Sequence, residues 1–229
     1  MRYLFFVSIV SILLSSGCQP VKPPRLTPIS AETFNTIVST DTPSLISPFA
    51  IPIFEKGLFK ATLNIGKHHL TGLAFIKKIQ TEDTDSTVSG TTYRMVLSNE
   101  FGMTYFDIET GNQSFNVNYC FGPLDKKMLW KVLKTDLKLL FPQEPDKSKE
   151  SFFLQDQTNL LVSKIKQGNF TRWNLYSPPD TLKEVRGKST LADHATITFS
   201  NFSNGFPSRI TLTNALIKLK FSLSLISIN

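Results

Sequence analysis

The stretch LDKKMLWKVLKTDLKLLFP, residues 124–142, separates two blocks of strand-like sequence and decides how they can fold. Its apolar residues recur at helical spacing, and its lysines fall on the opposite side. The apolar stripe comprises Leu124, Met128, Leu129, Val132, Leu133, Leu137, Leu139 and Leu140. Asp125 in the first turn and Pro142 after the last turn mark the two ends. The pattern predicts an amphipathic helix over residues 125–141.

The sequence before this helix alternates with a period of two, which is typical of half-buried strands. Phe59, Ala61 and Leu63 alternate with polar residues in the first strand, over residues 58–65. Short turns separate the strands that follow, and this arrangement predicts a five-strand antiparallel meander. The other four strands are expected at residues 69–79, 93–98, 103–108 and 115–119.

Six more strands are expected after the helix, at residues 160–166, 170–176, 182–186, 195–202, 208–213 and 217–228. An antiparallel sheet with one face in water needs a cover for the other face, and the amphipathic helix can supply it. The sequence therefore predicts an α+β fold that is mainly antiparallel β. We expect a curved half-barrel sheet of about eleven strands, covered by the amphipathic helix.

The N-terminus reads as a secretory signal. Arg2 is followed by an apolar block over residues 3–14 and then by Ser15-Ser16-Gly17-Cys18. This segment resembles a bacterial lipoprotein signal. In that family the signal is cut before the cysteine, so Cys18 would be acylated and would anchor the protein in a lipid membrane. Ordinary signal cleavage near Ser16-Gly17 is the alternative.

Three segments follow from these patterns. Residues 1–17 form the signal peptide, residues 18–29 form the lipidated cysteine with a proline-rich tether, and residues 30–229 form one domain. A short helix over residues 30–38 opens the domain, with Ser30 as its N-cap. The chain length of 229 residues suits a single domain of this kind.

Composition and motifs argue against several classes of function. The net charge of +7 is spread over scattered lysines, so no nucleic-acid partner is expected. Once Cys18 is acylated, Cys120 is the remaining thiol, and we expect it to be a buried small hydrophobic residue.

The histidines do not form a recognisable metal or catalytic site. His68 and His69 are adjacent on a strand, so their side chains should point to opposite faces. Asp193-His194 is not accompanied by a Gly-x-Ser-x-Gly motif. We therefore expect no catalytic residue, no metal and no cofactor, and we do not expect an enzyme.

The order of the elements resembles the LolA/LolB-like superfamily of periplasmic lipoprotein carriers and outer-membrane lipoprotein receptors. The resemblance covers roughly residues 30–229. It implies a half-open barrel whose apolar interior holds acyl chains under a helical lid. The receptor carries an apolar residue on the loop between its third and fourth strands. The turn over residues 99–102 places Phe101 at that point, as a candidate for membrane contact. By the same analogy, Gln19 in place of an aspartate after Cys18 favours the outer membrane, and the absence of an acidic cluster after Cys18 favours its periplasmic face.

The residues expected on the concave side are the candidate ligand-binding residues: Phe59, Leu63, Phe75, Tyr93, Met95, Phe106, Phe115, Met128, Val132, Phe199 and Phe221. Two interpretations of these residues stay open, a packed core and a cavity for acyl chains. The first hypothesis is a lipid-anchored periplasmic lipoprotein that binds lipid or lipoprotein acyl chains, with lipoprotein localisation as a candidate process. The alternative is a structural or assembly lipoprotein with a filled core that docks another envelope protein.

Overall fold

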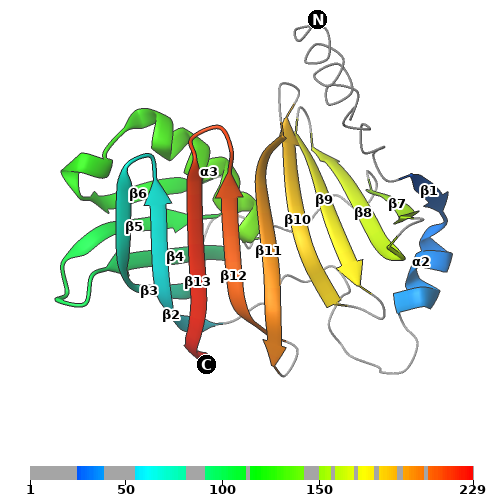
Figure 1. Cartoon of the computed structure of the whole chain (residues 1–229), viewed down its shortest axis with the longest axis horizontal. Helices are drawn as coiled ribbons and strands as arrows, with labels where there is room; N and C mark the ends of the chain where they lie inside the picture. Colours follow the sequence, from blue (N-terminus) through cyan, green and yellow to red (C-terminus); the bar gives the residue numbers. More distant parts are fainter. Residues whose placement is uncertain are drawn as a thin grey trace, which may run out of the picture.

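A computed structural model describes most of the chain from residue 25 onward (Figure 1). The described residues are 25–38, 55–80, 91–111, 114–141, 150–155, 158–167, 170–177, 181–189, 193–203 and 206–228. They form thirteen strands in one antiparallel sheet, with the order β1-β7-β8-β9-β10-β11-β12-β13-β2-β3-β4-β5-β6. The expected signal peptide, residues 1–17, and the expected lipidation site Cys18 lie outside the described residues.

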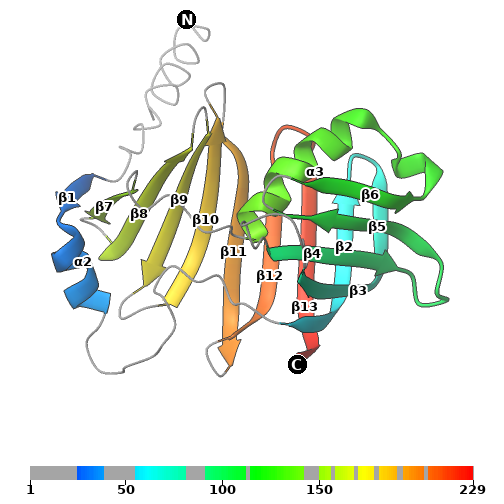
Figure 2. The same cartoon turned by 180° about the vertical axis from the view of Figure 1, so that it is seen from behind.

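The five-strand meander before the helix is confirmed. Its strands are β2 (Lys56–Ile65), β3 (His68–Gln80), β4 (Thr91–Ser98), β5 (Thr104–Thr110) and β6 (Phe115–Cys120). In Figure 2 the strands β4, β5 and β6 cross in front of β2, β13 and β12, so this half of the sheet curls over itself. The curl makes the concave interior that the sequence pattern predicted.

The strands after the helix continue the same sheet. They are β7 (Glu150–Gln155), β8 (Leu160–Gln167), β9 (Phe170–Ser177), β10 (Thr181–Ser189), β11 (Asp193–Ser203), β12 (Phe206–Asn214) and β13 (Leu219–Ile228). The last strand pairs with the first strand of the meander, and Phe221 lies opposite Leu63. The two strand blocks are therefore joined through β13 and β2, which lie far apart in the sequence.

Two of the thirteen strands were not expected, and they correct the predicted number of about eleven. β1 (Leu26–Ile29) lies in the segment assigned to the tether and pairs with β7 at one edge of the sheet. Pro28 obscured β1, although proline is tolerated on an edge strand. β7 was missed because Phe152, Phe153 and Leu154 are all half-buried, so its sequence does not alternate cleanly.

The predicted amphipathic helix is α3 (Lys127–Leu140), which follows a short 3-10 turn, η1 (Gly122–Leu124). Its buried face includes Leu129, Leu133 and Leu137. α3 contacts β5 on one side and β10 and β11 on the other, and it lies across the concave side of the sheet (Figure 2). The helix thus covers the core where the curled sheet leaves it open.

The predicted N-terminal helix is also present, as α2 (Ala31–Val38). The Thr33 amide donates a hydrogen bond of 3.1 Å to Ser30 Oγ, which is the expected N-cap contact. Phe34 is completely buried against Phe152 and Tyr176, at ring-centroid distances of 4.5 and 6.0 Å. None of the helices in the described part of the chain is long and apolar enough to cross a bilayer.

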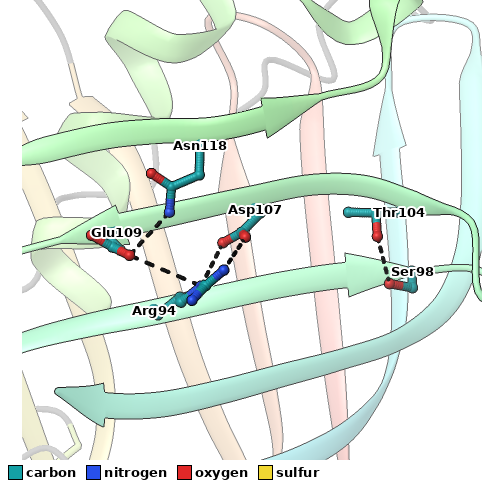
Figure 3. Close-up of polar contacts among 6 residues, drawn as sticks. All are labelled: Arg94, Ser98, Thr104, Asp107, Glu109 and Asn118. Carbon is teal, nitrogen blue, oxygen red and sulfur yellow. Dashed lines mark hydrogen bonds and ion pairs between the residues drawn. The ribbon is translucent and has the colours of Figure 1, made fainter.

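Polar contacts on the outer face hold the meander in register (Figure 3). Arg94 on β4 donates to both carboxylate oxygens of Asp107 on β5, at 2.9 and 2.5 Å. Glu109 lies 3.9 Å from the same guanidinium and accepts a 3.0 Å hydrogen bond from Asn118 on β6. Because Arg94 is about half exposed, the pair contributes little to stability, and its main effect is to align neighbouring strands.

Candidate functional site

Most of the expected ligand-binding residues lie in one packed cluster between the sheet and α3. Seven of the eleven are at most 5% exposed: Phe59, Leu63, Tyr93, Met95, Phe106, Phe199 and Phe221. Aromatic contacts fill the space between them. The Phe106 ring lies 6.2 Å from Trp130 of α3 and 6.5 Å from Phe221, and Tyr93 stacks on Phe141 at 4.6 Å. At these positions the side chains contact one another as a core.

Phe75 does not face this cluster and is 41% exposed, which corrects the sequence expectation. The register explains why. Phe59 lies opposite Ala74, and directly opposed residues share a face, so Phe75 lies opposite Leu58 on the outer face. Ala74 is fully buried in its place.

The other expected residues lie at the margin of the core. Met128 is 57% exposed at the start of α3 and is not among the buried residues of the helix. Phe115 and Val132 are half-buried. A stripe of three or four residues per two turns cannot bury every apolar position of a helix, and Met128 is one that remains outside.

An apolar pocket of about 530 Å³ opens at one end of the barrel, beside the start of α3. Three segments form its wall: the β2–β3 turn with its flanks at residues 65–68, the β12–β13 turn at residues 216–218, and the start of the helical segment. The last segment contributes Pro123, Leu124, Lys126, Met128 and Leu129. The two hairpin turns stand next to each other at the top of Figure 1, because β13 pairs with β2.

The local sequence explains the shape of the pocket wall. Gly66 has a φ of +55°, which a tight two-residue hairpin turn requires, and Lys218 has a φ of 50° in the second turn. Because residues 215–218 form this turn, the last strand begins at Leu219, two residues later than expected. Ile217 therefore lines the pocket and does not belong to the strand.

His68 and His69 point to opposite faces, as the sequence predicted. His68 lines the pocket, whereas His69 Nδ1 lies 2.5 Å from Asn64 Oδ1 in a cross-strand pair. Among the described residues, no group of three or more His, Cys, Asp or Glu side chains lies close enough together to hold a metal ion.

The charged side chains of the pocket are all basic lysines. Lys67, Lys126 and Lys218 line it, and none of the described lining residues is Asp or Glu. The nearest acidic residue in sequence, Asp125, accepts a 3.1 Å hydrogen bond from Trp130 Nε1 and is not part of the wall. The pocket therefore combines an apolar wall with cationic side chains.

A buried polar pair ties α3 to the turn that forms one wall of the pocket. Asn214 Nδ2 donates to both carboxylate oxygens of Asp136, at 3.1 and 2.9 Å, and Asn214 Oδ1 accepts from the Leu216 amide at 2.9 Å. Asp136 is completely buried, and burial raises the pKa of its carboxyl group to about 7, although the hydrogen bond from Asn214 opposes this shift. The position of the turn is thereby coupled to the helix.

The turn between β4 and β5 presents Phe101, which is 94% exposed. Asn99 Oδ1 accepts hydrogen bonds from the Phe101 amide at 3.0 Å and from the Met103 amide at 2.8 Å. The Asn99 side chain thus fixes the backbone while Phe101 points into solvent. Met103 beside it is 44% exposed, so the turn carries two accessible apolar side chains.

Sequence reasoning anticipated only one of the pocket residues as a ligand contact, Met128. The others lie in turns or on a 3-10 segment, and turn residues have no periodicity that marks an apolar wall. The signal that could have indicated the site is a lysine in each of the two hairpin turns, Lys67 and Lys218. Only the β13–β2 pairing brings those two turns together.

Comparisons with known proteins assign no family. No family model matches the chain, and no curated protein matches it. Among solved structures, it is similar to a DUF1329 family protein from Desulfovibrio piger, with 9% identity, a TM-score of 0.44, and coverage of 86% of this chain and 89% of that one.

Two further structures show similarity of the same order. One is a domain from Vibrio parahaemolyticus provisionally described as an outer membrane lipoprotein-sorting protein, with 12% identity, a TM-score of 0.41, and coverage of 76% and 83%. The other is a provisionally described exported protein with a YmcC-like fold from Bacteroides fragilis, with 10% identity, a TM-score of 0.24, and coverage of 77% and 96%. TM-scores below 0.5 do not place the chain in a family.

Proposed function

We propose that this chain is a lipoprotein of the LolA/LolB-like type, anchored in the outer membrane on its periplasmic side, that binds lipid or the acyl chains of another lipoprotein. The observation that carries the proposal is the apolar pocket of about 530 Å³ at the end of the half-barrel, beside the amphipathic helix α3. Its volume lies within the range of roughly 300–1,000 Å³ that is usual for small-molecule sites.

The pocket wall suits a ligand without fixed shape. Leu124 and Leu129, which are 3% and 6% exposed, form a buried apolar part of the pocket wall. Met128 stands at the margin, and an unbranched thioether side chain adapts to different apolar surfaces. No catalytic chemistry is proposed for this site.

Two parts of the chain would contact the membrane in this proposal. Cys18 supplies the acyl anchor, and Phe101 inserts from the β4–β5 turn. β1 and the β4–β5 turn lie at opposite ends of the long axis (Figure 1). Cys18 and Leu26 are eight positions apart, and this length of chain reaches at most about 25–30 Å when extended. Both contacts can therefore form together only if the long axis of the molecule lies along the membrane surface.

The packed interior favours a second candidate, a scaffold lipoprotein that docks another envelope protein. Most of the concave positions are filled by aromatic and aliphatic side chains. The edge strand β6 also exposes Val117 and Tyr119, which are 38% and 48% accessible. An edge strand with apolar side chains is a surface that another chain can pair with.

Mass spectrometry separates these candidates. The polypeptide without the anchoring cysteine, residues 19–229, is secreted behind a cleavable signal, purified without detergent and measured under native conditions. We expect a fraction of the protein to carry a bound lipid of defined mass. A protein that stays lipid-free after incubation with total envelope lipid would favour the scaffold.

The anchor needs its own measurement. In the native chain, the N-terminal peptide after processing should begin at Cys18 and carry fatty acids. An unmodified N-terminus after Ser16 or Gly17 would show ordinary signal cleavage and would contradict the proposed lipid anchoring in the outer membrane.

A further inference from the structure

We infer that the pocket beside α3 binds a single-chain anionic amphiphile, with the acyl chain against the apolar wall and the anionic head group at the lysines. This inference rests on the proposed lipid binding and specifies its ligand. Three properties of the pocket carry it: its size, the distribution of apolar surface and the sign of its charge.

The size of the pocket points to one chain. A methylene group is close to a water molecule in size, and water occupies about 30 Å³ in the liquid. A volume of about 530 Å³ therefore accommodates a chain of roughly 16 carbons.

The apolar surface is arranged for a chain that enters from solvent. Leu124 and Leu129 are buried at the base, whereas Met128 and Leu216 are 57% and 56% exposed. Large apolar side chains that stay this exposed beside a pocket extend its apolar surface outward. A bound chain would cover them and would remove that area from water.

The charge of the pocket selects the head group. Lys67, Lys126 and Lys218 come from three different segments and meet at the same pocket. Each ammonium group attracts an anion, and with no Asp or Glu among the described lining residues the attraction is not cancelled locally. A phosphate or carboxylate head group satisfies the lysines, whereas a zwitterionic head group brings its own cation to them.

Calorimetry with matched ligands tests the inference on the secreted polypeptide, residues 19–229. The probes are palmitoyl lysophosphatidylglycerol and palmitoyl lysophosphatidylcholine, both used below their micelle-forming concentrations. They share one chain and differ in head-group charge. We expect one ligand per protein and at least tenfold tighter binding of the anionic probe at low salt. The preference should shrink as salt screens the lysines.

Variants locate the site. The triple change Lys67→Gln, Lys126→Gln and Lys218→Gln should remove the preference while leaving binding of the zwitterionic probe unchanged. The matched control is Lys60→Gln, Lys134→Gln and Lys220→Gln, which changes the net charge equally at exposed positions outside the pocket. It should keep the preference. Met128→Trp, at an exposed position, should weaken binding of both probes at least tenfold by filling the pocket.

The outcomes separate this inference from the proposed function. Equal binding of the two probes, or binding that neither the lysine triple change nor Met128→Trp alters, would overturn the inference and leave lipid binding standing. More than one bound chain per protein would also overturn it. No binding of either probe would count against the inference and the proposed function together.

Discussion

Asn214, the last residue of β12, donates two hydrogen bonds to the buried carboxylate of Asp136 on α3, at 3.1 and 2.9 Å. The two residues are 78 positions apart in the sequence. Through the Leu216 amide, the same asparagine holds the turn that lines the pocket. One buried polar pair therefore links the covering helix to the end of the sheet that carries the pocket.

This pair makes stability depend on pH. The Asp136 carboxyl group has an ordinary pKa of 3.8 when unfolded and a pKa of about 7 in the fold, because burial disfavours its charge. The folded state thus holds a proton that the unfolded state releases. The contribution is fully present below about pH 4, is lost as the pH rises, and levels off above about pH 7.

We expect the Asp136→Asn variant to lose this dependence. The difference in unfolding free energy between the native protein and the variant should shift by roughly 2–4 kcal/mol between pH 4.5 and pH 8, with the native protein relatively less stable at the higher pH. Denaturant titrations at several pH values measure it. A difference that stays constant across this range would show that Asp136 does not titrate there.

Gly72 on β3 should not tolerate a side chain. A Cβ atom at this position would lie 1.9 Å from the Ser98 carbonyl oxygen, which is backbone and cannot move aside cheaply. We expect Gly72→Ala to lower the unfolding free energy by about 2–4 kcal/mol. Gly122→Ala is the control, since nothing lies within 4 Å of its Cβ, and it should change stability by less than about 0.5 kcal/mol. Urea unfolding of both variants checks the contrast.

Phe59 and Phe75 should respond oppositely to truncation, although both were expected to face the interior. Phe59 is fully buried, so Phe59→Ala should cost about 3–5 kcal/mol through lost burial and a cavity. Phe75 is 41% exposed on the outer face, and Phe75→Ala should cost less than about 1 kcal/mol. Thermal unfolding of the two variants compares their stabilities. Equal losses of stability would contradict the register of β2 and β3.

Cys120 should react slowly with alkylating reagents. Burial, with a smaller effect of Asp125, raises the pKa of its thiol to about 11, so little thiolate is present at pH 8. The secreted polypeptide, residues 19–229, has Cys120 as its one cysteine. At pH 8, the reaction of Cys120 with iodoacetamide should be at least tenfold slower in the folded protein than in the protein unfolded by denaturant. The folded rate should keep rising toward about pH 11, and a plateau near pH 9 would contradict the raised pKa.

The Phe101 side chain should contribute to membrane binding and not to the unfolding free energy. Its side chain is 94% exposed and the turn is held by Asn99, so Phe101→Ser should leave the unfolding free energy within about 0.5 kcal/mol. In the proposed function, the same change should reduce sedimentation with phospholipid vesicles. Glu100→Gln in the same turn is the control, and equal vesicle binding by all three proteins would exclude Phe101 as a contact.

The sequence predicted the repeating elements well because each has a local signal. Alternation over residues 58–65 identified β2, and the leucine stripe with Pro142 identified α3. Elements without such a signal were missed. β1 contains a proline, and β7 carries three half-buried apolar residues in a row. These two strands exist because they pair with each other and with β8.

The candidate site was harder to predict than the fold. Local alternation shows that a strand has two faces, but it does not show which face is buried when both carry apolar residues, as the exposed Phe75 demonstrates. The pocket depends on contacts between turns, and these turns are neighbours only through the β13–β2 pairing. Met128 was the one pocket residue expected to contact a ligand, although its exposure at the pocket margin was not expected.

By itself, the sequence determined the strand and helix pattern and the mainly antiparallel class, because these follow from periods of two and 3.6 residues. Only the tertiary structure decided the strand order, the inward faces, the Asp136–Asn214 pair and the pocket with its three lysines. The physical reason is the sequence separation of the residues that make each feature. Periodicity is a property of neighbouring residues, whereas a pocket is made by side chains that meet only after the last strand pairs with the first strand of the meander.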